Sequence, residues 1–421
     1  YRSNLLFLMA YSPDRQSQAT YRHEAMQWEQ MSLPESARKA ARQQTFVVPS
    51  LQDRPLRLGI LSAEVGQHAV AHFLKSWLPW LDRSRISLYL YPTRSYADDK
   101  SQAFAALADV WCPVEDWDDE AATRRIRADR IDVLIETSGH TAHNRLGIIA
   151  RRAAPVQCHY IGYFASTGLS EMDYFLADGT LIPNCLDHQF VERIWRLPRP
   201  WLAYTPLEEA PEPAWRPALD GKICLGSFNN LIKVRETCLE IWARLLLALP
   251  EAWLLLKDGR TLDETSRRRI RHALTSRGVS DERIVFAERA ATWREHMSQY
   301  DRVDIALDTV PLNSGTTAFD ALWMGVPLIT LAGDHMAGRM GAAIVAGIGK
   351  PDWITQDEDD YVTRVVTLAR DVVGRTRMRA VQREWMRASL LCDGADLADT
   401  LTDVFEQMLR QRTNSLNRAP P

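Results

Sequence analysis

The chain has 421 residues, 46% apolar and 25% charged, which is the composition of a globular protein long enough to form two domains. Its 51 basic and 54 acidic side chains give a net charge of -3, so it has no overall field that would attract nucleic acid or an anionic membrane. The six cysteines form no CxxC pair, which argues against a zinc site and against a disulfide framework. We therefore expect a cytoplasmic protein, and no apolar run reaches the roughly 18 residues that a membrane span needs.

The first 54 residues are expected to form a helical segment. Apolar side chains recur there at helical spacing as far as residue 47, with a break at Ser12-Pro13-Asp14. The sequence begins with Tyr rather than Met and lacks the basic-then-apolar layout of a signal peptide. We expect the natural protein to continue upstream of this segment.

Residues 55–205 alternate between strand and helix patterns. Two β-rich runs, 56–62 and 86–91, flank a helical stretch over 70–81, and together they predict a βαβ unit. The later elements expected in this half are helices at 118–130 and 145–152 and strands at 131–136, 157–162 and 174–177. This alternation predicts a parallel sheet with helices on both faces.

A proline-rich, acidic stretch breaks this alternation, and we expect a linker at 206–220. Residues 221–380 then repeat the alternation, from a strand at 223–228 to one at 327–331, and residues 381–421 are expected to be a helical tail. The sequence therefore predicts an α/β fold of two Rossmann-like domains. Their sheets would face a central cleft, where ligands of such folds bind.

Two histidines follow expected strands of the first half. His68 ends the sequence EVGQH between a strand and a helix, where the positive end of the helix favours a neutral imidazole that can act as a base or accept a hydrogen bond. A capping or core role is the alternative. For His140, in SGHT after a buried strand, binding and structural roles are equally open. The small-residue loop 162–168 could approach a phosphate or sugar, although such loops are more often turns.

The local pattern that points most directly to a binding site is NSGTTAFD at residues 313–320, between a strand and a helix. Backbone amides of Gly315, Thr316 and Thr317 at a helix start, with two hydroxyls, would hold a diphosphate without a metal ion. Asp320, one turn later, could reach a ribose or sugar hydroxyl. An ordinary Ser/Thr helix cap is the alternative interpretation.

Lys233 ends the sequence SFNNLIK, just after the first expected strand of the second half. A cation there could neutralise a leaving diphosphate in place of a metal ion, although most lysines are surface groups. Asn229 and Asn230 could be turn residues, and His296 could stack on a nucleobase or pack within the fold. No Walker-type, GxGxxG or GxSxG motif occurs, and no DxD pair stands at the end of an expected strand, so we expect neither a metal ion nor a cofactor.

A series of ordered motifs resembles the catalytic region of the O-linked N-acetylglucosamine transferase and SPINDLY family. The motifs are GQH at 66–68, SGHTAHNRLG at 138–147, RRAAPVQ at 151–157, GYFASTGLSEMDY at 162–174, SFNNLIK at 227–233, EH at 295–296 and LDTVPLNSGTTAFDALWMGVP at 307–327. The resemblance covers about residues 54–410. It implies a GT-B fold and an inverting transfer of a sugar, N-acetylglucosamine from UDP-GlcNAc first of all, to Ser or Thr of a protein.

The resemblance also implies roles for single residues. Lys233 would hold the diphosphate, His296 would pack on the base, and Asp320 would hold the ribose. His68 matches a histidine proposed as a base, which could instead orient the sugar. The catalytic candidates are thus His68 and Lys233, and the donor-binding candidates are His140, Asn229, Asn230, His296, Gly315, Thr316, Thr317 and Asp320. The family carries tetratricopeptide repeats before this region, so residues 1–47 could be the end of such an array.

The chain departs from the family pattern at two positions. Gly315 stands where the animal transferases have His, and Phe164 stands where the family usually has Pro. The GHTA and FNNL segments are closer to the SPINDLY side, where the donor can be GDP-fucose, so fucose and glucose transfer remain alternatives. A module that binds nucleotides or peptides without catalysis is the alternative of another class.

Overall fold

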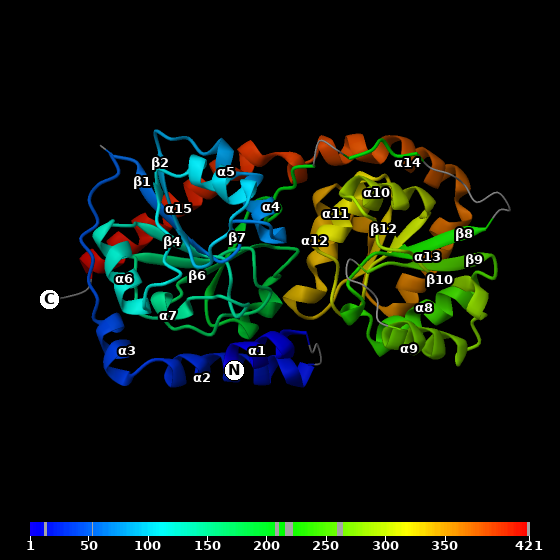
Figure 1. Ribbon diagram of the computed structural model, residues 1–421, viewed down its shortest axis with the longest axis horizontal. Coiled ribbons are helices and arrows are strands. Elements are labelled where there is room, and N and C mark those ends of the chain that lie inside the picture. The colour runs from blue at the N-terminus through cyan, green and yellow to red at the C-terminus, as the bar shows by residue number, and fades with distance from the viewer. Residues whose placement is uncertain (12–14, 53, 207–209, 215–221, 259–263, 419–421) are drawn as a thin grey trace. The chain divides into compact units, whose positions relative to one another are not determined.

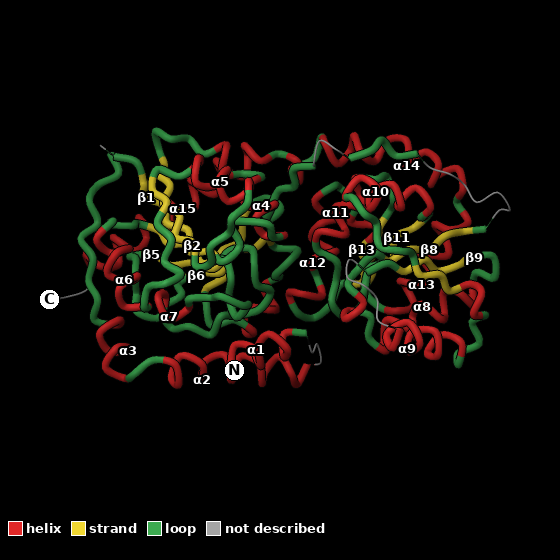
Figure 2. Tube along the Cα trace, viewed as in Figure 1, coloured by secondary structure: helices red, strands yellow, loops and turns green. Residues whose placement is uncertain are grey.

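The computed structural model describes residues 1–11, 15–52, 54–206, 210–214, 222–258 and 264–418. The chain forms two compact units: unit 1 is Tyr1–Thr205 with Asp393–Pro421, and unit 2 is Pro206–Cys392. Each unit is built on one parallel sheet (Figures 1 and 2). Within the described ranges, no helix is long and apolar enough to cross a membrane.

The sheet of unit 1 has seven strands in the order β3-β2-β1-β4-β5-β6-β7, all paired in parallel. The strands are β1 (Leu56–Ser62), β2 (Ile86–Pro92), β3 (Val110–Trp111), β4 (Val133–Glu136), β5 (Val156–His159), β6 (Tyr174–Asp178) and β7 (Arg193–Leu197). Every residue of β4 and β5 is buried, as expected for strands covered on both faces. The strand order reverses between β1 and β4, so polar residues after these two strands lie at the edge where such folds bind ligands.

Some helices of unit 1 begin at side-chain caps. They are α1 (Arg2–Ala10), α2 (Arg15–Ser32), α3 (Glu35–Arg42), α4 (Ala69–Lys75), α5 (Asp99–Leu107), α6 (Asp119–Ala128), α7 (Leu146–Ile149) and the 3-10 helices η1 (Leu78–Trp80) and η2 (Asn184–Gln189). Asp98 and Asp118 cap α5 and α6, accepting hydrogen bonds from backbone amides 2.7 and 2.6 Å away. The helix expected over 70–81 ends early, because Pro79 lies in the first turn of the separate helix η1. Strands β3 and β7 and helix α5 were not expected.

The last helix belongs to unit 1. Helix α15 (Gly394–Arg418) packs against β5 and η1 of that unit, and Arg85, just before β2, pairs with Asp403 and Glu406 on it. In Figure 1 this red helix lies among the blue and cyan elements of unit 1. The tail expected over 381–421 is therefore divided between the two units. Sequence periodicity cannot reveal such a return, because it depends on tertiary packing.

The sheet of unit 2 has six strands in the order β10-β9-β8-β11-β12-β13, also parallel. They are β8 (Ile223–Ser227), β9 (Ala252–Leu256), β10 (Ile284–Phe286), β11 (Ile305–Leu307), β12 (Leu328–Leu331) and β13 (Ile354–Thr355). The order reverses between β8 and β11. Residues that follow β8, β9 and β11 therefore share one edge of the sheet.

The helices of unit 2 lie between these strands and after them. They are α8 (Glu236–Ala248), α9 (Glu264–Thr275), α10 (Trp293–Ser298), α11 (Thr316–Trp323), α12 (Met340–Gly347), α13 (Glu358–Arg370), α14 (Val372–Arg387) and the 3-10 helices η3 (Leu231–Lys233), η4 (Asp281–Arg283), η5 (Gln299–Arg302), η6 (Met336–Gly338), η7 (Pro351–Trp353) and η8 (Leu390–Cys392). Strand β13 was not expected.

Helix α14 holds the end of α11 through buried polar side chains. The Nε atom of Arg383 donates to the Trp323 carbonyl at 2.8 Å, and a guanidinium nitrogen of Arg379 donates to the Met324 carbonyl at 2.8 Å. The amide nitrogen of Gln382 donates to the Leu322 carbonyl at 3.0 Å. These groups satisfy carbonyls that the last turn of a helix leaves without partners.

Candidate active site

The candidate residues of unit 2 gather at the carboxyl edge of its sheet. Asn229 and Asn230 follow β8, the motif 313–320 follows β11, and His296 lies on α10. Parallel strands bring their carboxyl ends to one edge, so residues far apart in sequence meet there. The contacts below show which of them come together.

The start of α11 is open. Gly315 caps this helix without a side-chain hydrogen bond, and a Cβ atom added to it would meet no other heavy atom within 4 Å. The amides of Thr316 and Thr317 lie in the first turn, where a helix leaves its N–H groups without internal partners. The positive end of the helix thus adjoins open space, which suits a phosphate group.

A buried carboxylate fixes the loop in front of α11. Asp308, fully buried after β11, accepts hydrogen bonds from the Ser314 amide at 2.6 Å and the Ser314 hydroxyl at 2.5 Å. It also accepts one from the Thr330 hydroxyl at 2.7 Å. Burial raises the pKa of this carboxyl group, while these hydrogen bonds and the Lys233 ammonium act to lower it. The loop that leads into α11 is therefore held in place by the buried Asp308 carboxylate.

Lys233 joins this loop directly. Its Nζ atom donates a 2.7 Å hydrogen bond to the carbonyl of Asn313, two residues before Gly315, although the bonded residues are 80 positions apart in sequence. Burial lowers the pKa of the Lys233 ammonium, and the nearby Asp308 carboxylate opposes that shift. The structure thus places a cation beside the open helix start.

The two asparagines are used within the protein. The amide of Asn229, a buried residue, donates to the Ser314 hydroxyl at 2.9 Å, and its oxygen accepts a 2.9 Å hydrogen bond from the Thr317 hydroxyl. Asn230 caps η3 by accepting from the Ile232 amide at 3.1 Å. Both side chains therefore position Thr317 and Lys233, and the geometry gives no support to direct contacts from these amides to a donor.

His296 lies in an aromatic setting near Asp320. The ring centre of His296 is 6.1 Å from that of Phe228 and 5.8 Å from that of Tyr300. Its Nε2 atom is 3.8 Å from Asp320 Oδ2, and both side chains are partly exposed, at 22% and 13%. A flat ring with a carboxylate beside it can take a base and a sugar hydroxyl.

Sequence reasoning missed Lys257, the residue directly after β9. This lysine is 2% exposed, and its Nζ atom lies 2.7 Å from His296 Nδ1. Burial lowers the pKa of its ammonium to about 8, while the Asp320 carboxylate opposes the shift. A lysine that ends the apolar run WLLLK is the one signal in the sequence that could have revealed it, because a lysine within the core must have a partner.

In unit 1, His68 caps α4 through its side chain. Its Nδ1 atom accepts a 3.2 Å hydrogen bond from the Val70 amide, and the residue is exposed. An imidazole nitrogen that accepts a hydrogen bond carries no proton, so the proton of the neutral ring is on Nε2. In this geometry Nε2–H is a hydrogen-bond donor, which supports an orienting role for His68 over that of a base.

His140 is a core residue. It is 1% exposed, its Nε2 lies 2.9 Å from the Thr167 carbonyl, and its Nδ1 lies 3.3 Å from the Ser3 hydroxyl. Burial lowers the pKa of this imidazole to about 4. Helices α1 and α2 supply Ser3 and the neighbouring Trp28 ring, so the donor-binding role expected for His140 has no support from the geometry.

Three buried carboxylates, also missed by sequence reasoning, hold the loops at the carboxyl edge of the unit 1 sheet. Glu64 accepts hydrogen bonds from the hydroxyls of Ser62, Thr137 and Ser138 at 3.0, 2.6 and 2.9 Å. Glu136 accepts from the Ser138 and Gly139 amides at 2.7 and 2.9 Å. Glu192 accepts from the Ser166 hydroxyl and the Thr167 amide, both at 2.6 Å, and so fixes the loop 162–168. This edge is polar, but its carboxylates bind their own loops.

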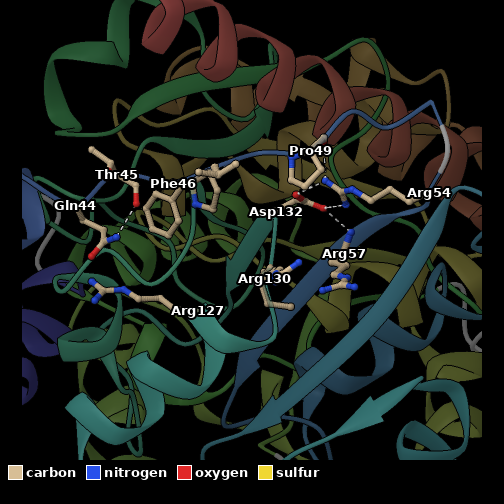
Figure 3. Close-up of a pocket in the computed structure, with 12 residues that line it drawn as sticks. Gln44, Thr45, Phe46, Pro49, Arg54, Arg57, Arg127, Arg130 and Asp132 are labelled. Atoms are coloured by element: carbon tan, nitrogen blue, oxygen red, sulfur yellow. Dashed lines mark hydrogen bonds and ion pairs between the residues drawn. The ribbon is translucent and has the colours of Figure 1, made fainter. Parts of the chain in front are cut away.

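A cavity of about 450 Å³ lies elsewhere in unit 1 (Figure 3). It is lined by Arg57 and Asp132, which lie at the beginning of β1 and just before β4, and by the segment 44–49. Asp132 accepts hydrogen bonds from Arg54 at 2.6 and 2.9 Å and from the Arg57 amide at 2.9 Å. These contacts serve the fold, and the cavity holds none of the expected site residues.

The comparisons with known proteins identify the family of the chain. The model of glycosyl transferase family 41 matches residues 6–203 and 218–400. The probable UDP-N-acetylglucosamine–peptide N-acetylglucosaminyltransferase SPINDLY of Petunia hybrida is 34% identical over 85% of this chain and 39% of its own length. The corresponding enzyme of Caenorhabditis elegans is 23% identical over 85% of this chain and 41% of its own length. The chain thus spans about two fifths of the length of these relatives.

A solved structure agrees over nearly the whole chain. A mutant of the O-GlcNAc transferase of Thermobaculum terrenum has a TM-score of 0.87 and 32% identity, over 99% of this chain and 78% of that one. A glycosyltransferase of Rickettsia africae, with a TM-score of 0.55 and 8% identity over 85% of this chain and 99% of that one, shares the fold alone. The expected fold class, two Rossmann-like sheets of GT-B type, is confirmed. With the family model matched in both units, the chain belongs to glycosyl transferase family 41.

Proposed function

We propose that this protein is an inverting, metal-independent glycosyltransferase that moves N-acetylglucosamine from UDP-N-acetylglucosamine to serine or threonine hydroxyls of proteins. The observation that carries the proposal is the contact of Lys233 with Asn313, just before the open start of α11. A cation and free helix amides at one place suit a diphosphate that leaves with negative charge. The names of the family 41 relatives support the sugar and the peptide acceptor.

In the proposed reaction the acceptor oxygen attacks the anomeric carbon of the sugar. The bond from that carbon to the diphosphate oxygen breaks, and the hydroxyl proton passes to a base. Negative charge grows on the diphosphate in the transition state, where the Lys233 ammonium and the amides of Thr316 and Thr317 would stabilise it. His68, with its proton on Nε2, would donate a hydrogen bond to a substrate oxygen rather than remove the proton.

The test is Lys233→Met, assayed with UDP-N-acetylglucosamine and a peptide or lysate as acceptor. We expect kcat to fall about 10²- to 10³-fold, the usual cost of removing one group that stabilises transition-state charge. Lys222→Met, which removes an exposed lysine just before β8, is the matched control and should keep full activity. Equal melting temperatures of the two variants would show that the fold is intact. Full turnover by Lys233→Met would refute the proposal.

The donor and the role of metal are tested in the same assay. GDP-fucose and UDP-glucose offered separately identify the sugar, and transfer from either one in place of UDP-N-acetylglucosamine would change the assignment. A chelator should leave the rate unchanged, because Lys233 and the helix start would take the place of a divalent ion. Nucleotide binding without sugar release to any acceptor would indicate a binding module instead.

A further inference from the structure

Lys257 is a lysine buried beside the candidate nucleotide site. It follows β9, its backbone amide donates to the Ser227 carbonyl at 3.1 Å, and the whole residue is 2% exposed. Its Nζ atom lies 2.7 Å from His296 Nδ1 and 5.5 Å from the centre of the Phe228 ring. Burial of an ammonium costs free energy unless it has a partner, so the contact with His296 is a specific feature of this fold.

This contact determines which nitrogen of His296 carries the proton. An ammonium has only donors, so His296 Nδ1 must accept, and the proton of the neutral ring must be on Nε2. The Nε2 atom is 3.8 Å from Asp320 Oδ2, which is longer than a hydrogen bond. The Nε2–H group is thus directed to the Asp320 side and remains available to a ligand there.

The rings around His296 leave its rotation undecided. Tyr300 meets the imidazole edge-on, at an interplanar angle of 85°, and Phe228 meets it at 53°. Such contacts hold the plane of the ring, but they do not distinguish its two faces, which differ by a half turn. A hydrogen bond to Nδ1 does distinguish them. Lys257 is the group placed to make that selection.

We propose that Lys257 is a positioning residue of the nucleotide site, whose buried ammonium selects one orientation and one tautomer of His296 and thereby sets the affinity for the nucleoside part of the donor. The proposal rests on the proposed function, in which His296 lies against the base. Because Lys257 itself is almost fully buried, it acts through His296 rather than by touching the nucleotide.

A dependence on pH follows from the charge of Lys257. The groups that face its Nζ atom are the His296 imidazole, the Asp320 carboxylate and the Phe228 ring. Its pKa is lowered to about 8, so the ammonium is present below pH 8 and is lost as the pH rises through that value. The neutral amine then no longer requires Nδ1 to accept, and nucleotide affinity should decline above pH 8.

The experiment measures UDP binding to the whole chain by calorimetry between pH 6.5 and 9.5. We expect Lys257→Met to weaken binding about tenfold at pH 7, the effect of one lost hydrogen bond to a charged group. Lys257→Arg should bind within a few fold of the wild type. The decline above pH 8 should be steeper in the wild type than in either variant, because both variants keep Lys233, whose ammonium also has a lowered pKa. Lys222→Met is the control and should behave as the wild type.

A double-mutant cycle separates positioning from mere packing. If Lys257 acts through His296, then Lys257→Met should weaken binding much less in a His296→Ala background than in the wild type. Nitrogen chemical shifts of His296 should show protonation at Nε2 in the wild type and a mixture of tautomers in Lys257→Met. A loss caused by altered packing would change neither the coupling nor the tautomer.

The outcomes distinguish this inference from the proposed function. A wild-type protein that does not bind UDP would overturn the proposed function. Normal UDP binding with equal affinity in Lys257→Met, or with additive effects in the cycle, would overturn the role of Lys257 alone. If Lys257→Met does not fold, the pH profile of the wild type and the affinity of Lys257→Arg decide the matter.

Discussion

The carboxyl edges of the two sheets are both polar, yet they use their polar groups differently. In unit 1, carboxylates such as Glu64 and Glu136 are buried and accept hydrogen bonds from their own loops. In unit 2, Lys233 and the open turn before α11 leave positive charge next to free space. The same topology thus gives one edge whose carboxylates are already hydrogen-bonded within the protein and another edge whose positive charge remains available to a ligand. The difference lies in the residues after the strands, since both sheets reverse their order at the same kind of point.

Gly162, in the loop after β5 of unit 1, should not tolerate one added methyl group. A Cβ atom at Gly162 would lie 1.9 Å from the Thr137 carbonyl oxygen, which is backbone and cannot move aside cheaply. We expect Gly162→Ala to lower the free energy of unfolding by about 3 kcal/mol. At Gly179, in the same unit, a Cβ atom would meet nothing within 4 Å, so Gly179→Ala is the control. If denaturant unfolding shows the two variants to be equally stable, the backbone around Gly162 is not closely packed.

The buried His140 should make the stability of unit 1 depend on pH. Its pKa is about 4 in the folded protein and near 6.5 when unfolded, so the unfolded chain binds the proton first as the pH falls. The stabilisation is therefore complete above pH 6.5 and is lost between pH 6.5 and 4, by about 3 kcal/mol. Denaturant unfolding of the wild type and of His140→Gln across this range measures the difference. A gap between the two proteins that does not change with pH would contradict it.

One methyl group added at Gly315 tests whether the substrate uses the open space at the start of α11. A Cβ atom added at Gly315 would meet no other heavy atom within 4 Å, so Gly315→Ala should lower the melting temperature only slightly. The methyl group would nevertheless enter the space beside the first-turn amides. We expect kcat/KM to fall about tenfold, a modest loss of transition-state contact. Undiminished turnover would show that the substrate does not use this space.

Much of unit 2 could be predicted from its sequence. Apolar runs alternate there with helical patterns, so the strand ends share an edge, and this places Lys233 and the turn before α11 together. The contact between Lys233 and Asn313 agrees with that logic. His140 shows the limit of such predictions. The helices that bury it, α1 and α2, are far from it in the sequence, and no sequence pattern indicates that they pack against it.

Lys257 shows a second limit. In the sequence it is the polar end of an apolar strand, which is where a solvated lysine commonly stands. Only the packing of α10 against the same edge turns that position into a buried one, next to His296. The division of the C-terminal tail is of the same kind, since the return of α15 to unit 1 rests on pairs such as Arg85 with Glu406, 321 positions apart.

Helix α11 is anchored to α14 at its last turn. Its last carbonyls are fastened by Arg379, Gln382 and Arg383, while its first turn opens onto the site. Because these hydrogen bonds fix its last turn, α11 cannot shift along its axis when a ligand binds at its first turn. The hydrogen-bonded amides beyond the first turn of α11 should therefore exchange with solvent about as slowly in the empty protein as in the loaded one, whereas the amides of Thr316 and Thr317 should be protected only by the ligand. Any adjustment to the substrate is then made by the side chains at the open end of α11, so the backbone of the site is preorganised and does not close around the ligand.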